Sequence, residues 1–314
     1  MNLSSHLKNH QIENIILVHG TFAGNDAFGL FDLIEPISQD LSNTLKQHGK
    51  ALLNKIAGDV GNYTPTYATE LNKLCNIPCE LFIWGSGNYH LARLQGALDL
   101  ANYLAQQINQ KRLQGKRILL MGHSHAGQLF ALLSRFLSDA EDIYSIMAEN
   151  PELLVAKQHL LLQLNIIKTT QLDFVTFGTP IRYAWGKPQN SRVLAIVNHR
   201  SDSTPSGILS TRDGDYVQHW GITGTDGFPP NNLKLNDAFD KVLDKGRDLN
   251  RIIEQPSTRQ KNPIADNLFI DYQDNSTDAL DFNHCIKTLF GHGVYTQMNK
   301  MQFNLNTIIN HWYN

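Results

Sequence analysis

Six short apolar runs, rich in Ile, Leu, Val and Phe, alternate with amphipathic stretches along the chain. Each run predicts a buried strand, and most end at glycine or a polar cluster; they cover residues 14–18, 81–84, 118–121, 174–177, 193–197 and 267–272. Apolar side chains recur every three or four residues in 91–108, 126–137 and 294–312, which predicts helices with one core-facing stripe. This alternation predicts an α/β fold with a mostly parallel sheet of about six strands, flanked by helices on both faces.

Two longer segments interrupt the alternation. Residues 21–78 are expected to hold one helix, from about 36 to 49, and a polar loop. Residues 203–263 begin rich in Gly, Pro, Ser and Asp and continue into a charged helix around 237–254. We expect one domain over 1–314, with these inserts carrying function, because long loops in compact domains commonly do so.

Composition narrows the class of protein. Of 314 residues, 41% are hydrophobic and 18% charged, and the net charge is -2, which disfavours a disordered chain and a nucleic-acid partner. Residues 1–11 are polar, and no apolar run approaches the roughly 18 residues of a membrane span. We therefore expect a cytoplasmic protein without stable membrane insertion. Export without a cleaved signal remains an alternative. The three cysteines, Cys75, Cys79 and Cys285, lack disulfide-framework or zinc spacing and are interpreted as ordinary thiols.

The strongest chemical motif is Gly-His-Ser-His-Ala at 122–126. It follows an apolar strand and opens an amphipathic helix, which is the context of a nucleophile elbow. Such an elbow exposes its serine on a tight turn and needs small residues two positions before and after it. The motif therefore predicts Ser124 as a nucleophile.

A glycine turn at the end of the first strand, His19-Gly20-Thr21, supplies a second part. Backbone amides there can face a nucleophile on a neighbouring strand. The amide of Thr21, together with that of His125 at the helix start, is the predicted oxyanion hole.

Three segments together resemble the α/β-hydrolase superfamily, particularly bacterial lipases and esterases. They read Leu-Val-His-Gly at 17–20, Gly-His-Ser-His-Ala-Gly at 122–127 and Thr-Phe-Gly-Thr-Pro at 176–180. Trp-Gly-Ser-Gly-Asn at 84–88, with Ala-Arg-Leu-Gln at 92–95, is similar to a group of lipase-like hydrolases. The resemblance covers roughly 14–200 and 284–312, and Ala126 stands where the family usually has glycine.

The resemblance implies the chain order nucleophile, acid, histidine. Asp202, just after the strand at 193–197, is the favoured acid, and further loop acids remain open as alternatives: Asp213, Asp215 and Asp226. His292, before the last helix, is favoured over His284 as the base. His123 and His125 are interpreted as pocket lining, since no zinc-type spacing supports a metal site built from them and His219.

The sequence thus predicts a serine hydrolase that cleaves carboxylic esters through a Ser124–His292–Asp202 triad and an acyl-enzyme. The expected substrate is a small-molecule ester or a lipid. No cofactor, metal or nucleic acid is expected, and the oligomeric state stays open. Two alternatives remain: a non-catalytic binding protein of the same fold, and a lipid-directed effector phospholipase.

Overall fold

The computed structural model describes most of the chain. The described residues are 3–20, 62–138, 140–189, 191–199, 214–215, 218, 232–243, 262, 264–273 and 291–314.

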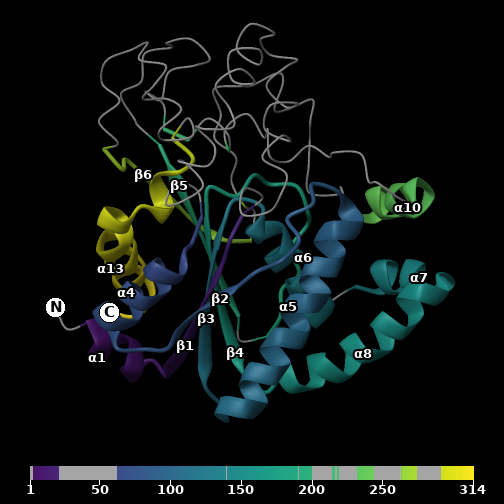
Figure 1. The fold of residues 1–314 in the computed structure, drawn as a ribbon, viewed down its shortest axis with the longest axis horizontal. Coiled ribbons are helices and arrows are strands. Elements are labelled where there is room, and N and C mark those ends of the chain that lie inside the picture. The colour runs from purple at the N-terminus through teal and green to yellow at the C-terminus, as the bar shows by residue number, and fades with distance from the viewer. Residues whose placement is uncertain are drawn as a thin grey trace, which may run out of the picture.

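A six-stranded sheet forms the centre of the structure (Figure 1). Its strands lie in the order β2-β1-β3-β4-β5-β6 and pair in parallel throughout. Their bounds are Ile12–Val18 (β1), Cys79–Phe82 (β2), Arg117–His123 (β3), Gln171–Phe177 (β4), Arg192–Asn198 (β5) and Asp266–Ile270 (β6). All six predicted strands, and the predicted α/β class, are confirmed.

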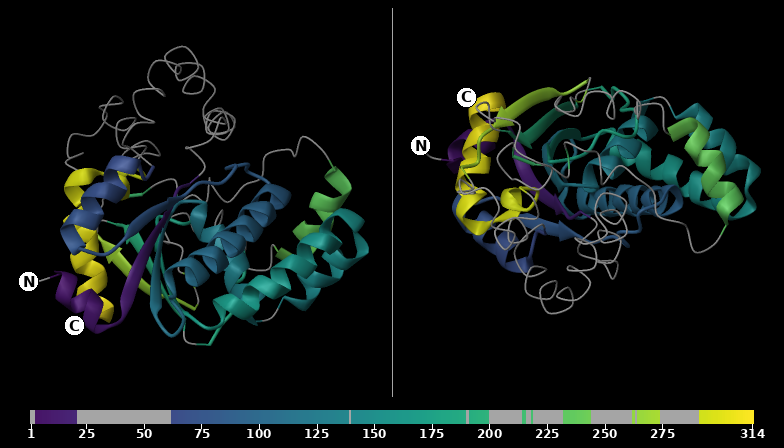
Figure 2. Two further views of the ribbon diagram at one scale, coloured as in Figure 1. Left: turned by 60° about the horizontal axis from the view of Figure 1, so that its bottom comes forward. Right: turned by 90° about the horizontal axis from the view of Figure 1, so that it is seen from above.

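Helices cover both faces of this sheet, as predicted, because consecutive residues of the central strands are buried on alternate sides. One face packs against α5 (His90–Lys111), α6 (Ala126–Ser138) and α8 (Pro151–Ile167), with α7 (Glu141–Glu149) and α10 (Leu233–Leu243) outside them. The other face packs against α1 (Leu3–Asn9), α4 (Pro65–Cys75) and α13 (Met301–Trp312). Figure 2 shows these two groups on opposite sides, with the two chain ends close together beside α13.

Two sequence predictions of helices need correction. Within the expected polar loop the chain forms the helix α4. Thr64 caps this helix by accepting a hydrogen bond from the amide of Tyr67. The buried side chains of α4 repeat at helical spacing: Tyr67, Ala68, Leu71 and Cys75. The terminal helix begins at Met301 instead of residue 294. Two 3₁₀ turns, Val294–Thr296 and Met298–Lys300, precede it, and the extended backbone of Gln297 separates them.

The remaining helix predictions are partly described. The charged helix expected around 237–254 corresponds to α10, which begins at Leu233 and extends to Leu243; residues 244–254 lie outside the described residues. The helix expected at 36–49 also lies outside them. No helix in the described part of the chain is long and apolar enough to cross a membrane.

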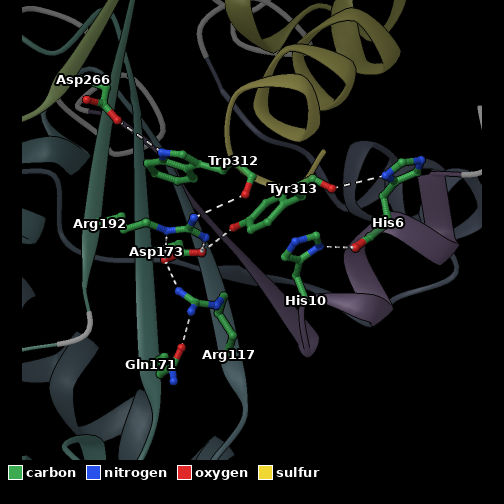
Figure 3. Close-up of polar contacts among 9 residues, drawn as sticks. All are labelled: His6, His10, Arg117, Gln171, Asp173, Arg192, Asp266, Trp312 and Tyr313. Carbon is green, nitrogen blue, oxygen red and sulfur yellow. Dashed lines mark hydrogen bonds and ion pairs between the residues drawn. The ribbon is translucent and has the colours of Figure 1, made fainter.

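A buried carboxylate fastens the amino-terminal edge of the sheet. Asp173 on β4 pairs with Arg117 Nη1 at 2.6 Å and Arg192 Nη2 at 2.7 Å, and it accepts from the Tyr313 hydroxyl (Figure 3). Both arginines are the first residues of their strands. Burial, followed by the negative charge of Asp173, raises the pKa of Tyr313 well above its ordinary value. The network joins three strands to the end of the chain; it lies opposite the carboxyl edge, where open α/β sheets usually bind their ligands.

Candidate active site

Ser124 occupies a sharp turn between β3 and α6. Its φ of +56° lies in the left-handed region, which costs a residue with a side chain about 1–2 kcal/mol. Two hydrogen bonds hold this backbone: the Ser124 amide donates to the carbonyl of Phe177 at 2.9 Å, and the Thr179 hydroxyl donates to the Ser124 carbonyl at 2.7 Å. The turn has the strained strand-to-helix geometry of a nucleophile elbow.

Gly20, at the end of β1, approaches this serine closely. A Cβ atom at position 20 would lie 2.7 Å from Ser124 Cβ and 3.3 Å from Ser124 Oγ, so only glycine fits there. The backbone that leads into Thr21 therefore passes directly beside the Ser124 hydroxyl. Thr21 itself lies outside the described residues, while His125, the other predicted oxyanion donor, follows Ser124 immediately before α6.

His292 forms a buried pair with Asp215. Its Nδ1 lies 2.9 Å from Asp215 Oδ2 and 3.1 Å from Oδ1, and both side chains are fully buried. Since a carboxylate can only accept, Nδ1 carries a proton, and a ring with no second proton keeps a lone pair on Nε2. An imidazole in this tautomer can accept a proton at Nε2.

Asp215 has further donors besides His292. The backbone amide of Gln218 donates to Oδ1 at 2.8 Å, and the Tyr295 hydroxyl donates to Oδ2 at 2.8 Å. Burial alone would raise the pKa of Asp215, but the interaction with His292 and these hydrogen bonds hold it below its ordinary value. Asp215 is therefore a carboxylate at neutral pH.

Tyr295 is itself fixed at the sheet. Its hydroxyl oxygen accepts from the backbone amide of Asn198, the last residue of β5, at 2.8 Å. Burial, followed by the charge of Asp215, raises the pKa of Tyr295 well above its ordinary value, so the phenol keeps its proton and donates a hydrogen bond to Asp215. Sequence reasoning missed this residue, because a tyrosine beside an apolar stripe reads as core.

Three contacts bring the pair to the edge that carries Ser124. His123 Nε2 donates to the carbonyl of His292 at 2.8 Å, and the two imidazole centroids are 4.6 Å apart. Gly178 directly follows Phe177, the acceptor of the Ser124 amide. A Cβ at Gly178, whose φ is +59°, would overlap Asp215 Oδ2 and lie 3.1 Å from His292 Nδ1. Serine and pair thus lie at the ends of neighbouring strands.

Two atoms of the candidate site have no hydrogen-bond partner. Within the described residues, Ser124 Oγ and His292 Nε2 are both buried and unpaired. Buried polar atoms in folded proteins are normally satisfied, so the unpaired state of Ser124 Oγ and His292 Nε2 needs an explanation. A hydroxyl donor and an imidazole acceptor are complementary in chemistry.

Ser86 provides an informative comparison within the same edge. It has the same φ of 56°, it is buried, and its Oγ lies 3.4 Å from Nδ1 of His19. However, His19 Nδ1 donates to the Gly20 carbonyl at 2.6 Å, and its Nε2 accepts from the amide of Trp84 at 3.2 Å. Neither nitrogen of His19 remains to accept a proton from Ser86. Burial lowers the pKa of His19, which keeps this ring neutral and structural.

The predicted site residues have different outcomes. Ser124, His125 and His292 lie at the carboxyl edge of the sheet. Asp215, which the sequence ranked behind Asp202, is the carboxylate that meets His292. Several other candidates lie outside the described residues: Thr21, Asp202, Asp213, His219, Asp226 and His284.

The histidines beside the serine differ from the sequence interpretation in one respect. His123 is fully buried and holds the backbone of His292, so it supports the candidate base instead of lining a pocket. Among the described residues no group of three or more His, Cys, Asp or Glu side chains could hold a metal ion.

Comparison of the chain with protein-family models, curated proteins and solved structures gave no match.

Proposed function

We propose that the protein is a serine hydrolase that cleaves carboxylic esters through a Ser124–His292–Asp215 triad. One observation carries the proposal: His292 commits Nδ1 to a buried carboxylate, and its unpaired Nε2 lies at the same sheet edge as the unpaired hydroxyl of Ser124. The chain order of these three residues, and the motifs at 17–20, 122–127 and 176–180, agree with the resemblance to α/β-hydrolases.

The chemistry follows from the roles of these groups. His292 Nε2 takes the Ser124 proton as Oγ attacks the ester carbonyl carbon, and Asp215 stabilises the resulting imidazolium. The amides of His125 and Thr21 are the proposed donors to the tetrahedral oxyanion, aided by the positive end of α6. The imidazolium then protonates the departing alkoxide, and a water molecule, activated by the same imidazole, hydrolyses the acyl-enzyme.

The substrate class is a small-molecule ester or a lipid. It comes from the resemblance to lipases and esterases, because thioesters and amides would use the same groups. No cofactor takes part in this mechanism.

Labelling with a fluorophosphonate tests the proposal. The reagent should modify Ser124, which lies in the tryptic peptide 118–135, and leave Ser86 in peptide 74–93 unmodified. Ser86 is a matched control, since it shares the burial and left-handed backbone of Ser124 but lacks an available base. Ser124→Ala should abolish labelling and reduce ester turnover by several powers of ten. An unlabelled Ser124 in folded protein would refute the proposal and favour the non-catalytic binding protein.

A further inference from the structure

Two of the three cysteines lie together, far from Ser124 in the sequence. Cys75 ends α4 and Cys79 begins β2, and their Sγ atoms are 3.9 Å apart. Between them Asn76 adopts a left-handed conformation, with φ 52°, that reverses the chain out of the helix. The turn from α4 to β2 thus brings the two thiols into contact.

The two thiols differ in access to solvent. Cys75 is fully buried, and its Sγ donates to the carbonyl of Leu71 at 3.0 Å. Cys79 is partly exposed, and its Sγ donates to the carbonyl of Ile77 at 3.2 Å. The contact between the two thiols lowers the pKa of Cys75, and the same contact, followed by burial, raises the pKa of Cys79, so the Cys79 thiolate that reacts is a minor species at neutral pH. One thiol can therefore meet a reagent in solution, while the other can meet only its neighbour.

We propose that Cys75 and Cys79 form a modification site, a reversible disulfide made by a low-molecular-weight disulfide such as oxidised glutathione. The Cys79 thiolate attacks one sulfur of the reagent, which releases one glutathione thiolate and leaves a mixed disulfide on Cys79. The Cys75 thiolate then attacks Cys79 Sγ and expels the second glutathione. Two electrons and two protons pass from the cysteine pair to the reagent. The Sγ atoms must close from 3.9 Å to about 2.05 Å, the length of a disulfide bond.

The bond would fasten an edge of the sheet. Among the described strands β2 pairs only with β1, and α4 packs against it. A disulfide here closes a loop of only five residues, 75–79. Because short loops gain little entropy, we expect Tm to rise by roughly 2–5 °C on oxidation. The inference is independent of the proposed esterase activity.

Peptide mapping of the unmodified full chain tests it. Trypsin releases both cysteines in peptide 74–93 and places Cys285 separately in 262–287. After treatment with oxidised glutathione and denaturing alkylation with N-ethylmaleimide, peptide 74–93 should lack two hydrogens and carry no maleimide; dithiothreitol should reverse this. Two maleimides on that peptide, or glutathione retained on Cys79 in the unsubstituted chain, would overturn the proposal.

Two variants test the order of attack. Cys75→Ser should trap glutathione on Cys79, because the second thiol is missing. Cys79→Ser should leave Cys75 reduced, because that thiol is buried. Circular dichroism checks that each variant is folded. Glutathione on Cys75 in folded Cys79→Ser protein would contradict the assigned order.

Discussion

Tyr295 Oη lies 2.8 Å from Asp215 Oδ2, the same carboxylate oxygen that lies 2.9 Å from His292 Nδ1. The phenol and the imidazole donate to the same oxygen, which has a lone pair for each, and the phenol helps to fix the position of that oxygen. Since the Tyr295 hydroxyl also accepts from the amide of Asn198 at the end of β5, it connects the carboxylate to the sheet and restricts its movement. We interpret Tyr295 as a positioning residue.

This relationship predicts how stability responds to acid. The pKa of Asp215 in the folded protein lies below its ordinary value of 3.8, so the folded state binds its proton less readily than the unfolded state. The stabilisation is fully present above the ordinary value and is lost as pH falls through the lower folded value. Tyr295→Phe removes one cause of that lowering, so the acid-dependent part of the unfolding free energy should shrink. Urea unfolding between about pH 7 and pH 3 measures it.

Tyr272→Phe is the matched control for this experiment. Tyr272 is also fully buried, and its hydroxyl donates to Asn304 instead of a carboxylate. This variant should lose stability by about 1 kcal/mol at all pH values and keep the slope of the original chain. Equal slopes in Tyr295→Phe and the original chain would show that Tyr295 only packs.

A second prediction concerns the acid of the proposed triad. Asp215→Asn should lower kcat by about 10³–10⁴-fold, because an amide can donate to Nδ1 and so favours the wrong tautomer of His292. Asp202→Asn should stay within about tenfold of the original chain. Steady-state kinetics on a short-chain ester compare the two variants. A larger loss in Asp202→Asn would return the role of acid to the residue that the sequence favours.

The strands and the candidate nucleophile could be predicted because their signals are local. A buried parallel strand appears as an unbroken apolar run, and the elbow around Ser124 combines strand, turn and helix within a few residues. His292, the candidate base, could also be selected from the sequence, since it lies shortly before the last helix. Each of these features depends on neighbours in the chain.

The partner of His292 could not be chosen in this way. Several acids follow β5, and hydropathy does not separate them. A bridge between His199 and Gly214, and a hydrogen bond from the Asp215 amide to the Asn198 carbonyl at 2.9 Å, bring the returning chain back to the end of the strand. Asp215 is therefore beside His292, 77 residues away in sequence. Two further hydrogen bonds are consistent with the late start of α13: the Tyr295 hydroxyl donates to Asp215 and accepts from the amide of Asn198, which holds residue 295 outside the helix.

A third prediction concerns Gly178, whose missing side chain leaves space for Asp215 and His292. Gly178→Ala would combine a positive φ with an overlap on Asp215 Oδ2 and a distance of 2.6 Å to Tyr295 Cε2. We expect a loss of at least about 2 kcal/mol in the free energy of unfolding and a fall in kcat of more than about a hundredfold. Denaturation and ester kinetics on the folded fraction measure the two effects.

Gly115→Ala separates backbone strain from this overlap. Gly115 also has a positive φ, +73°, but a Cβ there would meet no atom within 4 Å. It should cost about 1–2 kcal/mol of stability and leave kcat unchanged. If both variants keep full activity, the packing around Gly178 does not position the His292–Asp215 pair.

The last prediction concerns the opposite edge of the sheet. Asp173→Asn removes the carboxylate that pairs with Arg117 and Arg192 in Figure 3, and it weakens the hydrogen bond from Tyr313. Loss of one partner from a buried ion pair costs about 3–5 kcal/mol, and we expect the lower end because both arginines reach solvent. Asp266→Asn is the control: its exposed carboxylate bonds His311 and Trp312 near the same chain end and should contribute less than about 1 kcal/mol. Urea unfolding gives both values, and kcat of the folded protein should stay unchanged because the network lies at the amino ends of the strands.

A matching loss of stability in both variants would mean that burial of Asp173 adds nothing to the strength of its ion pairs.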